Sequence, residues 1–259
     1  MTDPLPSGPR LAGRRGGRPA ETTDRRSPDM STTNLIKATR SGPITLDLTL
    51  VAGLIQVVVA DGTYAQIELS TDEDSGLAAD AVNKPVIAHR GDCLSIDASI
   101  RGGVVQGAVY GNVQVNNFGG VRIGGVNYGG IQVGGGSVVS QNSSPITARA
   151  LLPIGSSLIA DATSAPIQVR GPLNRAKVRT TNGRIELDIV RDLDVETISG
   201  SIAVVELAGD GRAETVSGSI TVERGGPYRL IAETVSGNIT APNPIRLDGR
   251  TVSGRVRNY

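Results

Sequence analysis

Cysteine, histidine and aromatic residues are nearly absent from this chain of 259 residues, and each shortage excludes a class of site. The single cysteine, Cys93, excludes an intrachain disulfide and any multi-cysteine metal site. The single histidine, His89, excludes a histidine pair on a metal and leaves a Ser-His-Asp catalyst only one candidate base. Aromatic residues make up 2% of the chain, so a core must consist of aliphatic residues and threonine. Such a composition is typical of narrow, layered β structures.

An excess of one charge and long apolar runs are also missing. The chain has 26 Lys and Arg residues against 25 Asp and Glu residues, so no overall field attracts nucleic acid. No stretch approaches the ~18 consecutive apolar residues of a membrane helix. The amino terminus lacks the apolar run of a secretion signal. The sequence therefore predicts no nucleic-acid partner, no membrane span and a cytoplasmic location, with surface exposure left open.

The amino-terminal segment differs in composition from the rest of the chain. It is rich in Pro, Gly and Arg, and it has too few apolar residues to offset the entropy of ordering. We predict a disordered arm over residues 1–33. GC-rich coding gives such a composition, which indicates an actinobacterial source. Met30, where the ordered pattern begins, is an alternative start of the chain.

Residues 34–100 have the pattern of an antiparallel amino-terminal β module that caps the repeats after it. Alternating apolar residues predict strands between Ile44 and Ser70, with turns at Gly53 and at Asp61–Gly62. An Asp-Gly pair between apolar runs is a strong signal for a β-hairpin. Residues 71–84 form the one helix candidate, and residues 93–100 return to a strand pattern. The intervening sequence HRGDC reads as a turn at the edge of a strand.

A Gly-rich segment over residues 101–139 interrupts this pattern. An aromatic residue, glycine and a short strand-like run recur in it as YGNVQV, FGGVRI and YGGIQV. Residues 101–136 contain no Asp or Glu, which excludes a calcium-binding roll. No phosphate-binding glycine motif is present. We predict a series of short strands, and because uncharged edge strands pair readily, the segment is a candidate for self-association.

The unit Thr-apolar-Ser-Gly recurs through residues 140–259. Aligned copies place threonine at positions 180, 197, 215, 234 and 251. A period near 18 residues, with strand-forming composition and no helix between copies, predicts an all-β fold with a β-solenoid of single-stranded rungs. The glycine of each copy, at positions 183, 200, 218, 237 and 254, is expected at a corner that needs a positive φ.

Strand alternation predicts which side of each repeat faces inward. Thr and Ser share one face, and Glu and the apolar residue share the other. Facing Glu inward would bury carboxylates ~4.8 Å apart, at several kcal/mol each. We therefore place Thr and Ser inward, followed beyond the turn by Ile185, Ile202, Ile220, Ile239 and Val256.

The outward columns are the candidate site of the chain. A run of Glu bracketed by Arg179 and Arg250 is either a cation or ligand site or, as we expect, a solvated face whose end arginines relieve repulsion. The apolar stripe beside it is either covered by the amino-terminal strands, which we favour, or exposed to a partner. The possible partner surface consists of Ile198, Val216, Val235, Val252, Glu196, Glu214 and Glu233.

At these residues the chain resembles a bacterial β-strand-repeat family named putative adhesins, a family of unknown function. LDLTLVAGLIQVVVADG and QIELST carry the likeness at one end, and TVSGSI and TVSGNI carry it at the other. The likeness covers the chain from about residue 40 to its end, apart from the Gly-rich segment. It implies a β-repeat fold, and it transfers no catalytic residue because the family has none established.

Three functions are compatible with the sequence. The main expectation is a non-enzymatic scaffold or binding protein of unknown ligand, with no catalytic, cofactor or metal residues and with a protein partner or self-association. The alternative is a self-assembling structural protein similar to bactofilins, against which the arginines of the last repeat argue. A carbohydrate-active enzyme would need paired carboxylates, and carbohydrate binding is left open. The acidic cluster near the repeats is Asp188, Asp192 and Asp194.

Overall fold

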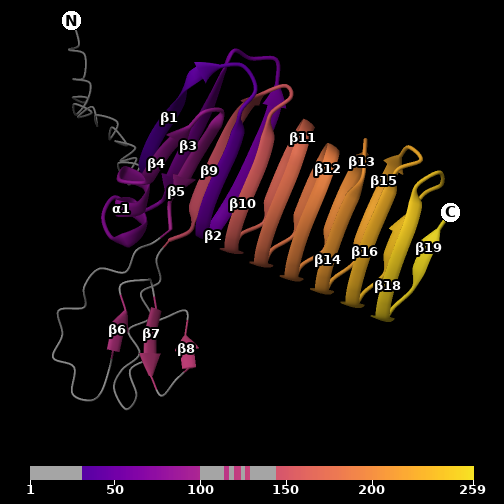
Figure 1. Ribbon diagram of the computed structural model, residues 1–259. Coiled ribbons are helices and arrows are strands. Elements are labelled where there is room, and N and C mark those ends of the chain that lie inside the picture. Colours follow the sequence, from indigo (N-terminus) through magenta and orange to yellow (C-terminus); the bar gives the residue numbers. More distant parts are fainter. Residues whose placement is uncertain (1–30, 100–113, 117–119, 124–125, 129–143) are drawn as a thin grey trace, which may run out of the picture.

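The computed structural model describes residues 31–99, 114–116, 120–123, 126–128 and 144–259. Within these residues the chain is nearly all β, with a single helix, α1 (Leu77–Asn83). Sixteen strands form one open sheet of mixed direction, and three more form a second sheet. Figure 1 shows the large sheet running from the amino-terminal strands to the yellow strands at the carboxy-terminal end.

The amino-terminal strands belong to the same sheet as the repeats. They are β1 (Thr32–Ser41), β2 (Thr45–Ala60), β3 (Tyr64–Thr71), β4 (Val86–Arg90) and β5 (Cys93–Asp97). Strand β2 pairs in parallel with β10 (Ser157–Ser164), from Ser157 opposite Thr45 onward, and in parallel with β5. The module is therefore of mixed direction and not antiparallel as predicted, although β1 with β3 and β4 with β5 do pair antiparallel. The alternating pattern from which a strand was predicted here buries Leu46, Leu48 and Leu50 of β2.

The turn predicted at Gly53 is wrong, because β2 continues through it. Before Gly53 the strand pairs with β5 and β10, and after it with β9 (Ile146–Pro153) and β11 (Ile167–Asn182). A Cβ at Gly53 would lie 1.8 Å from the carbonyl oxygen of Ile146. Glycine therefore marks a close approach of two backbones where the strand changes partners.

The Asp61–Gly62 pair does form a turn, but the predicted hairpin is wrong. Strand β9 lies between β2 and β3, parallel to β2 and antiparallel to β3. Alternate residues of β9 are buried, among them Ile146 and Leu152. The apolar face of β9 therefore completes the core between two strands that are neighbours in sequence.

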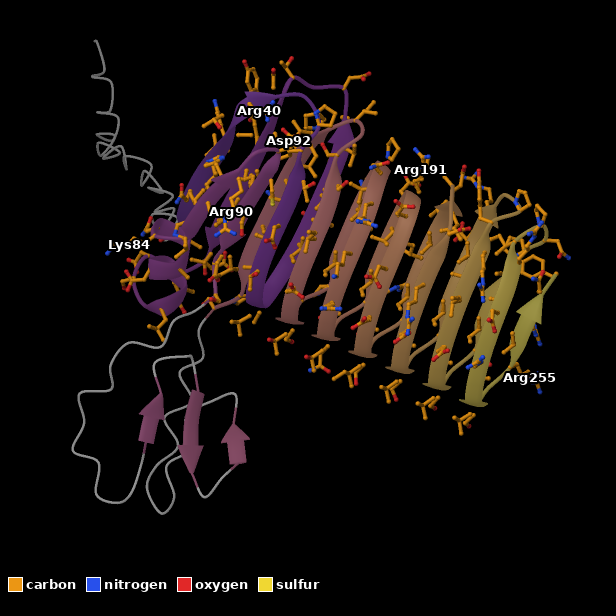
Figure 2. All side chains as sticks on the ribbon, viewed as in Figure 1. Arg40, Lys84, Arg90, Asp92, Arg191 and Arg255 are labelled. Atoms are coloured by element: carbon orange, nitrogen blue, oxygen red, sulfur yellow. The ribbon has the colours of Figure 1, made fainter. Side chains whose placement is uncertain are left out.

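The remaining amino-terminal predictions are close to the structure. Helix α1 occupies the second half of the predicted span 71–84 and buries Ala78, Ala79 and Val82. The sequence HRGDC joins β4 to β5 in an antiparallel pair, with Gly91 at φ 60°. Figure 2 shows Arg40 and Asp92, which form an ion pair, at this end of the sheet, and Arg255 at the other end.

The predicted arm and the Gly-rich segment lie mostly outside the described residues. The predicted arm ends at residue 33, whereas β1 begins at Thr32. In the Gly-rich segment the described strands are β6 (Gln114–Asn116), β7 (Gly120–Ile123) and β8 (Val126–Tyr128). They pair antiparallel in sequence order.

The repeats pair with one another in parallel and in register. One ladder runs from β12 through β14, β16 and β18, and a second runs from β12 through β13, β15, β17 and β19. Thr215 stands opposite Thr197 on one side and Thr234 on the other. The strands that follow β11 are β12 (Ile185–Ser199), β13 (Ile202–Leu207), β14 (Gly211–Ser217), β15 (Ile220–Gly225), β16 (Arg229–Ser236), β17 (Ile239–Ala241), β18 (Arg246–Ser253) and β19 (Val256–Asn258).

The inward rows agree with the sequence prediction except at two kinds of position. Thr180, Thr197, Thr215 and Thr234 are about 5% exposed, and Ile185, Ile202, Ile220 and Ile239 are completely buried. The serines, predicted inward, are exposed because each strand ends at its serine, where the chain turns toward solvent. Val256 is 43% exposed because β19 is the outermost strand of its ladder in the described part of the chain.

Candidate binding groove

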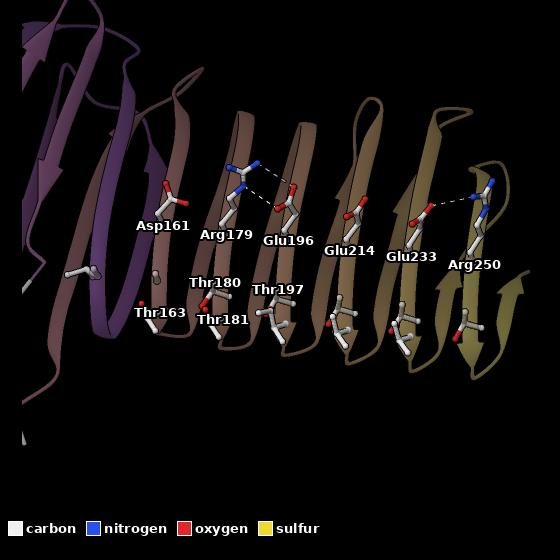
Figure 3. A pocket seen from close by; sticks show the side chains of 18 of the residues that line it. Asp161, Thr163, Arg179, Thr180, Thr181, Glu196, Thr197, Glu214, Glu233 and Arg250 are labelled. Carbon is white, nitrogen blue, oxygen red and sulfur yellow. Dashed lines mark hydrogen bonds and ion pairs between the residues drawn. The ribbon is translucent and has the colours of Figure 1, made fainter. Parts of the chain in front are cut away.

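A groove of about 760 Å³ runs across the repeats on the outward face of the strands that end in Ser-Gly. The groove is lined by residues of β2, β10, β11, β12, β14, β16 and β18. Figure 3 shows a row of charged side chains along one side of this groove and the threonines further along the same strands. All seven residues of the predicted partner surface line it: Ile198, Val216, Val235, Val252, Glu196, Glu214 and Glu233.

The Thr-x-Ser-Gly unit builds the floor of the groove by linking each repeat to its neighbour. The hydroxyl of Thr215 donates to the carbonyl of Gly200 at 3.1 Å, and Thr234 and Thr251 repeat this bond one and two repeats later. The backbone N–H of Gly200 donates to the carbonyl of Ser217 at 3.1 Å. An inward threonine can therefore satisfy a carbonyl group of the preceding turn.

The glycine of the unit serves close stacking, so the predicted positive φ is wrong at four of the five positions. Gly200, Gly218, Gly237 and Gly254 lie outside the left-handed region. A Cβ on any of these four would lie 1.8–2.0 Å from the carbonyl oxygen of the glycine in the preceding repeat. No side chain fits at that distance, so glycine allows the turns to stack directly on one another.

Thr197 is the exception among the inward threonines. Its hydroxyl oxygen is buried and makes no hydrogen bond within the described residues. The preceding copy of the motif reads Thr-Thr-Asn-Gly, and Thr180 there donates to the carbonyl of Asn182 at 3.3 Å. The stack of hydroxyl-to-glycine bonds therefore begins only at Thr215.

The charged row of the groove pairs each glutamate with one arginine. Arg179 contacts Glu196 through two nitrogens, with Nε 3.2 Å from Oε2. Arg250 lies 3.8 Å from Glu233. These pairs agree with the predicted relief of repulsion by the end arginines. Because the pairs are solvent-exposed, each contributes less than about 1 kcal/mol to stability.

The central glutamate, Glu214, has a partner that was not predicted from the sequence. Arg212, two residues before Glu214 on β14, forms an ion pair with it. Residues i and i+2 of a strand share a face, so this spacing was the available signal. The groove therefore carries carboxylates and guanidinium groups in an ordered pattern, in which the three glutamates are each engaged within the chain.

The apolar row of the groove is uncovered in the described part of the chain. Val216 and Val235 are each 48% exposed, and Ile198 is 52% exposed. The predicted cover by the amino-terminal strands is wrong because β2 pairs edge to edge with β10 and β11, and the other amino-terminal strands extend the same sheet beyond β2. Val51 of β2, which the sequence analysis did not include, also lines the groove and is exposed.

The predicted acidic cluster does not line the groove. Asp188, Asp192 and Asp194 all lie on β12. The carboxylate of Asp188 accepts a hydrogen bond from the backbone N–H of Gly171 at 3.0 Å, so it holds a corner of the neighbouring strand. Asp194 stands opposite Arg212 in the parallel register.

Other site chemistry in the described ranges is sparse. No three His, Cys, Asp or Glu side chains there are grouped so that they could hold a metal ion. Burial raises the pKa of the Cys93 thiol, and the negative charge of Asp47 raises it further, whereas Arg90 lowers it. No helix among the described residues is long and apolar enough to cross a membrane.

Comparisons with known proteins give likenesses among solved structures only. No family model and no curated protein sequence matches the chain. A "putative cell adhesion protein" from Clostridium sporogenes is 13% identical, with 88% of this chain and 97% of that chain covered and a TM-score of 0.44. A "putative adhesin" from Parabacteroides distasonis gives 13% identity, the same coverage and a TM-score of 0.39. A "putative adhesin" from Parabacteroides merdae is 12% identical, with 88% of this chain and 96% of that chain covered and a TM-score of 0.38.

Proposed function

We propose that this protein is a non-enzymatic β-solenoid scaffold that binds a partner in the groove across its repeats. The observation that carries the proposal is the uncovered apolar row beside an ordered row of charges. An exposed apolar stripe costs solvation free energy, and a contact surface for a partner accounts for it.

The solenoid is supported by the two parallel ladders that meet at each Ser-Gly turn. Each repeat contributes one strand before its glycine and one after it, and both pair with the same neighbouring repeat. The glycine-on-glycine contacts hold the turns of successive repeats in one column. Such a stack buries its core between repeats and presents regular rows outward.

The proposed absence of catalysis is supported by the roles of the groove's polar groups. The hydroxyls of Thr215, Thr234 and Thr251 bond glycine carbonyls, and the three glutamates are engaged by arginines. The same residue types recur from one repeat to the next. A group that recurs in successive layers serves the stack rather than one reaction at one place.

The groove favours a partner that offers both aliphatic and basic groups. Its apolar row takes aliphatic side chains, and its carboxylates, spaced ~4.8 Å apart along the ladder, attract cations. The arginines at both ends of the row also accept acidic groups. A protein surface of mixed charge supplies aliphatic, basic and acidic groups together.

Selection from a displayed peptide library tests this proposal with the folded chain as bait. We expect enriched peptides to combine aliphatic with basic residues and to lose at least about tenfold in affinity on Val216→Asp, since a buried charge replaces an apolar contact. The matched control is Val86→Asp on β4, outside the groove, because Val86 has the same exposure, 48%.

Two results would overturn the proposal. Enriched peptides that bind the Val216→Asp variant as tightly as the original chain would remove the groove as the binding face. Turnover of a polysaccharide or small metabolite that the same substitution abolishes would replace the scaffold with an enzyme. Circular dichroism of both variants verifies that each is folded.

A further inference from the structure

We propose that the groove's partner is a second copy of this chain, packed face to face about a two-fold axis parallel to the strands. This inference rests on the proposed function, because it uses the same groove. A two-fold interface must be self-complementary, so the rows of the groove have to match themselves when the order of repeats is reversed. The charges of this face are self-complementary in one alignment of the repeats of the two copies, which we call the register.

The charged row has an order that pairs opposite charges on reversal. From β10 to β18 it reads Asp161, Arg179, Glu196, Glu214, Glu233 and Arg250, each in register with the next. With the axis between Glu196 and Glu214, Arg179 faces Glu233 of the second copy and Asp161 faces Arg250 of the second copy. Each contact occurs twice in the dimer, which gives four attractive pairs.

A second outward row supports the same register. Two residues before the charged row, Lys177, Asp194 and Arg212 stand opposite one another in succession. Reversal about the same axis places Asp194 against Arg212 of the second copy. The repulsive contact, Glu196 against Glu214, also occurs twice, and it is weakened because Arg179 pairs with Glu196 and Arg212 pairs with Glu214.

Other registers are unfavourable. A shift of one repeat in one direction places Lys177 against Arg212 and Asp161 against Glu233. A shift in the other direction places Arg179 against Arg250 and a glutamate against its own copy. Like charges directly opposed across an interface are unfavourable, and each shift opposes more of them than the proposed register does, so that register is selected.

The apolar row packs against itself in this register. Ile198 faces Val216 of the second copy, and Val235 faces Thr181 of the second copy, all residues of the groove. Sheets that pack face to face lie ~10 Å apart, so side chains of this length meet in the middle. The contact covers the apolar row that the described part of the chain leaves exposed.

The size of the face sets the expected strength of the dimer. Six strands at ~4.8 Å and five residues at ~3.3 Å give a face of roughly 500 Å² per copy. Both copies together reach only about the lower limit of 1,000 Å² for a specific interface. We therefore expect a reversible dimer in the micromolar range that weakens at high salt.

Sedimentation velocity of the full chain over a range of concentrations tests the inference. We expect Arg179→Glu and Glu233→Arg each to weaken the dimer at least about tenfold, because each reverses two symmetry-related pairs. The double variant restores the affinity to near its original value. Three repeats, ~14 Å, separate the two residues within one chain, so rescue requires an interface.

Arg184→Glu is the matched control. Arg184 forms a surface pair with Glu186, 2.8 Å from Nε to Oε1, and lies outside the groove, so its reversal leaves the dimer unchanged. Thermal melts establish that the variants fold. Arg179→Gln removes the charge without reversing it, so it should weaken the dimer less than Arg179→Glu does.

A chain that stays monomeric at all concentrations would overturn the inference, and so would a dimer that Arg179→Glu does not weaken. Failure of the double variant to restore the dimer would exclude the proposed register. The two proposals fail separately: library peptides that need Val216 to bind a purely monomeric chain would support the groove and refute the dimer.

Discussion

Replacing Gly218 with alanine tests whether the repeats are held by direct stacking of their turns. The new Cβ would lie 2.0 Å from the carbonyl oxygen of Gly200 and 2.6 Å from its carbonyl carbon. Carbon and oxygen atoms in contact keep about 3.3 Å or more apart. The two backbones must therefore separate by more than about 1 Å at this point.

This separation has a cost that follows from the bonds around Gly200. The hydroxyl of Thr215 and the N–H of Gly200 both bridge the two repeats at 3.1 Å. Losing these two hydrogen bonds and straining a packed ladder lowers the free energy of unfolding by about 3 to 5 kcal/mol. For a chain of this size the expected fall in Tm is roughly 6 to 20 °C.

Thermal unfolding followed by circular dichroism measures the effect, with Gly62→Ala as the control. A Cβ at Gly62 would have its nearest neighbour 3.9 Å away, and its φ lies outside the left-handed region. We expect the control to stay within about 0.5 kcal/mol of the original chain. A Gly218→Ala variant as stable as the control would refute the stacking argument.

Two further predictions concern the inward threonines and the lone thiol. Thr215→Val removes a hydrogen bond and should lower the free energy of unfolding by about 1 to 2 kcal/mol. Thr197→Val should be neutral or stabilising, because the Thr197 hydroxyl has no partner among the described residues. Urea unfolding measures both variants, and equal losses of stability would contradict the assignment of these hydrogen bonds. Asp47→Asn should lower the raised pKa of Cys93 and so speed alkylation by iodoacetamide at mildly alkaline pH; an unchanged rate would exclude the charge effect.

The faces of the repeats could be predicted because they depend on local alternation and on the cost of burying charge. Thr215 and Ile220 lie inward and Glu214 and Val216 lie outward, as that argument requires. The same argument failed for Ser217, because alternation ends where the strand turns. The sequence named the glutamates and the apolar row of the groove but not Val51, whose place beside them depends on pairing between strands. It did not name Arg212 as the partner of Glu214, although their spacing on one strand is a local signal.

The sequence by itself determined the period of the repeats, their strand composition and the pattern of their two faces. Only the tertiary structure decided that β9 separates β2 from β3, that glycine serves contact between repeats, and that the apolar row is left open by the described strands. The physical reason is the separation in sequence of the residues that interact. Alternation and turn chemistry act between residues close in sequence, whereas backbone approach and strand pairing join residues far apart, and no local pattern records them.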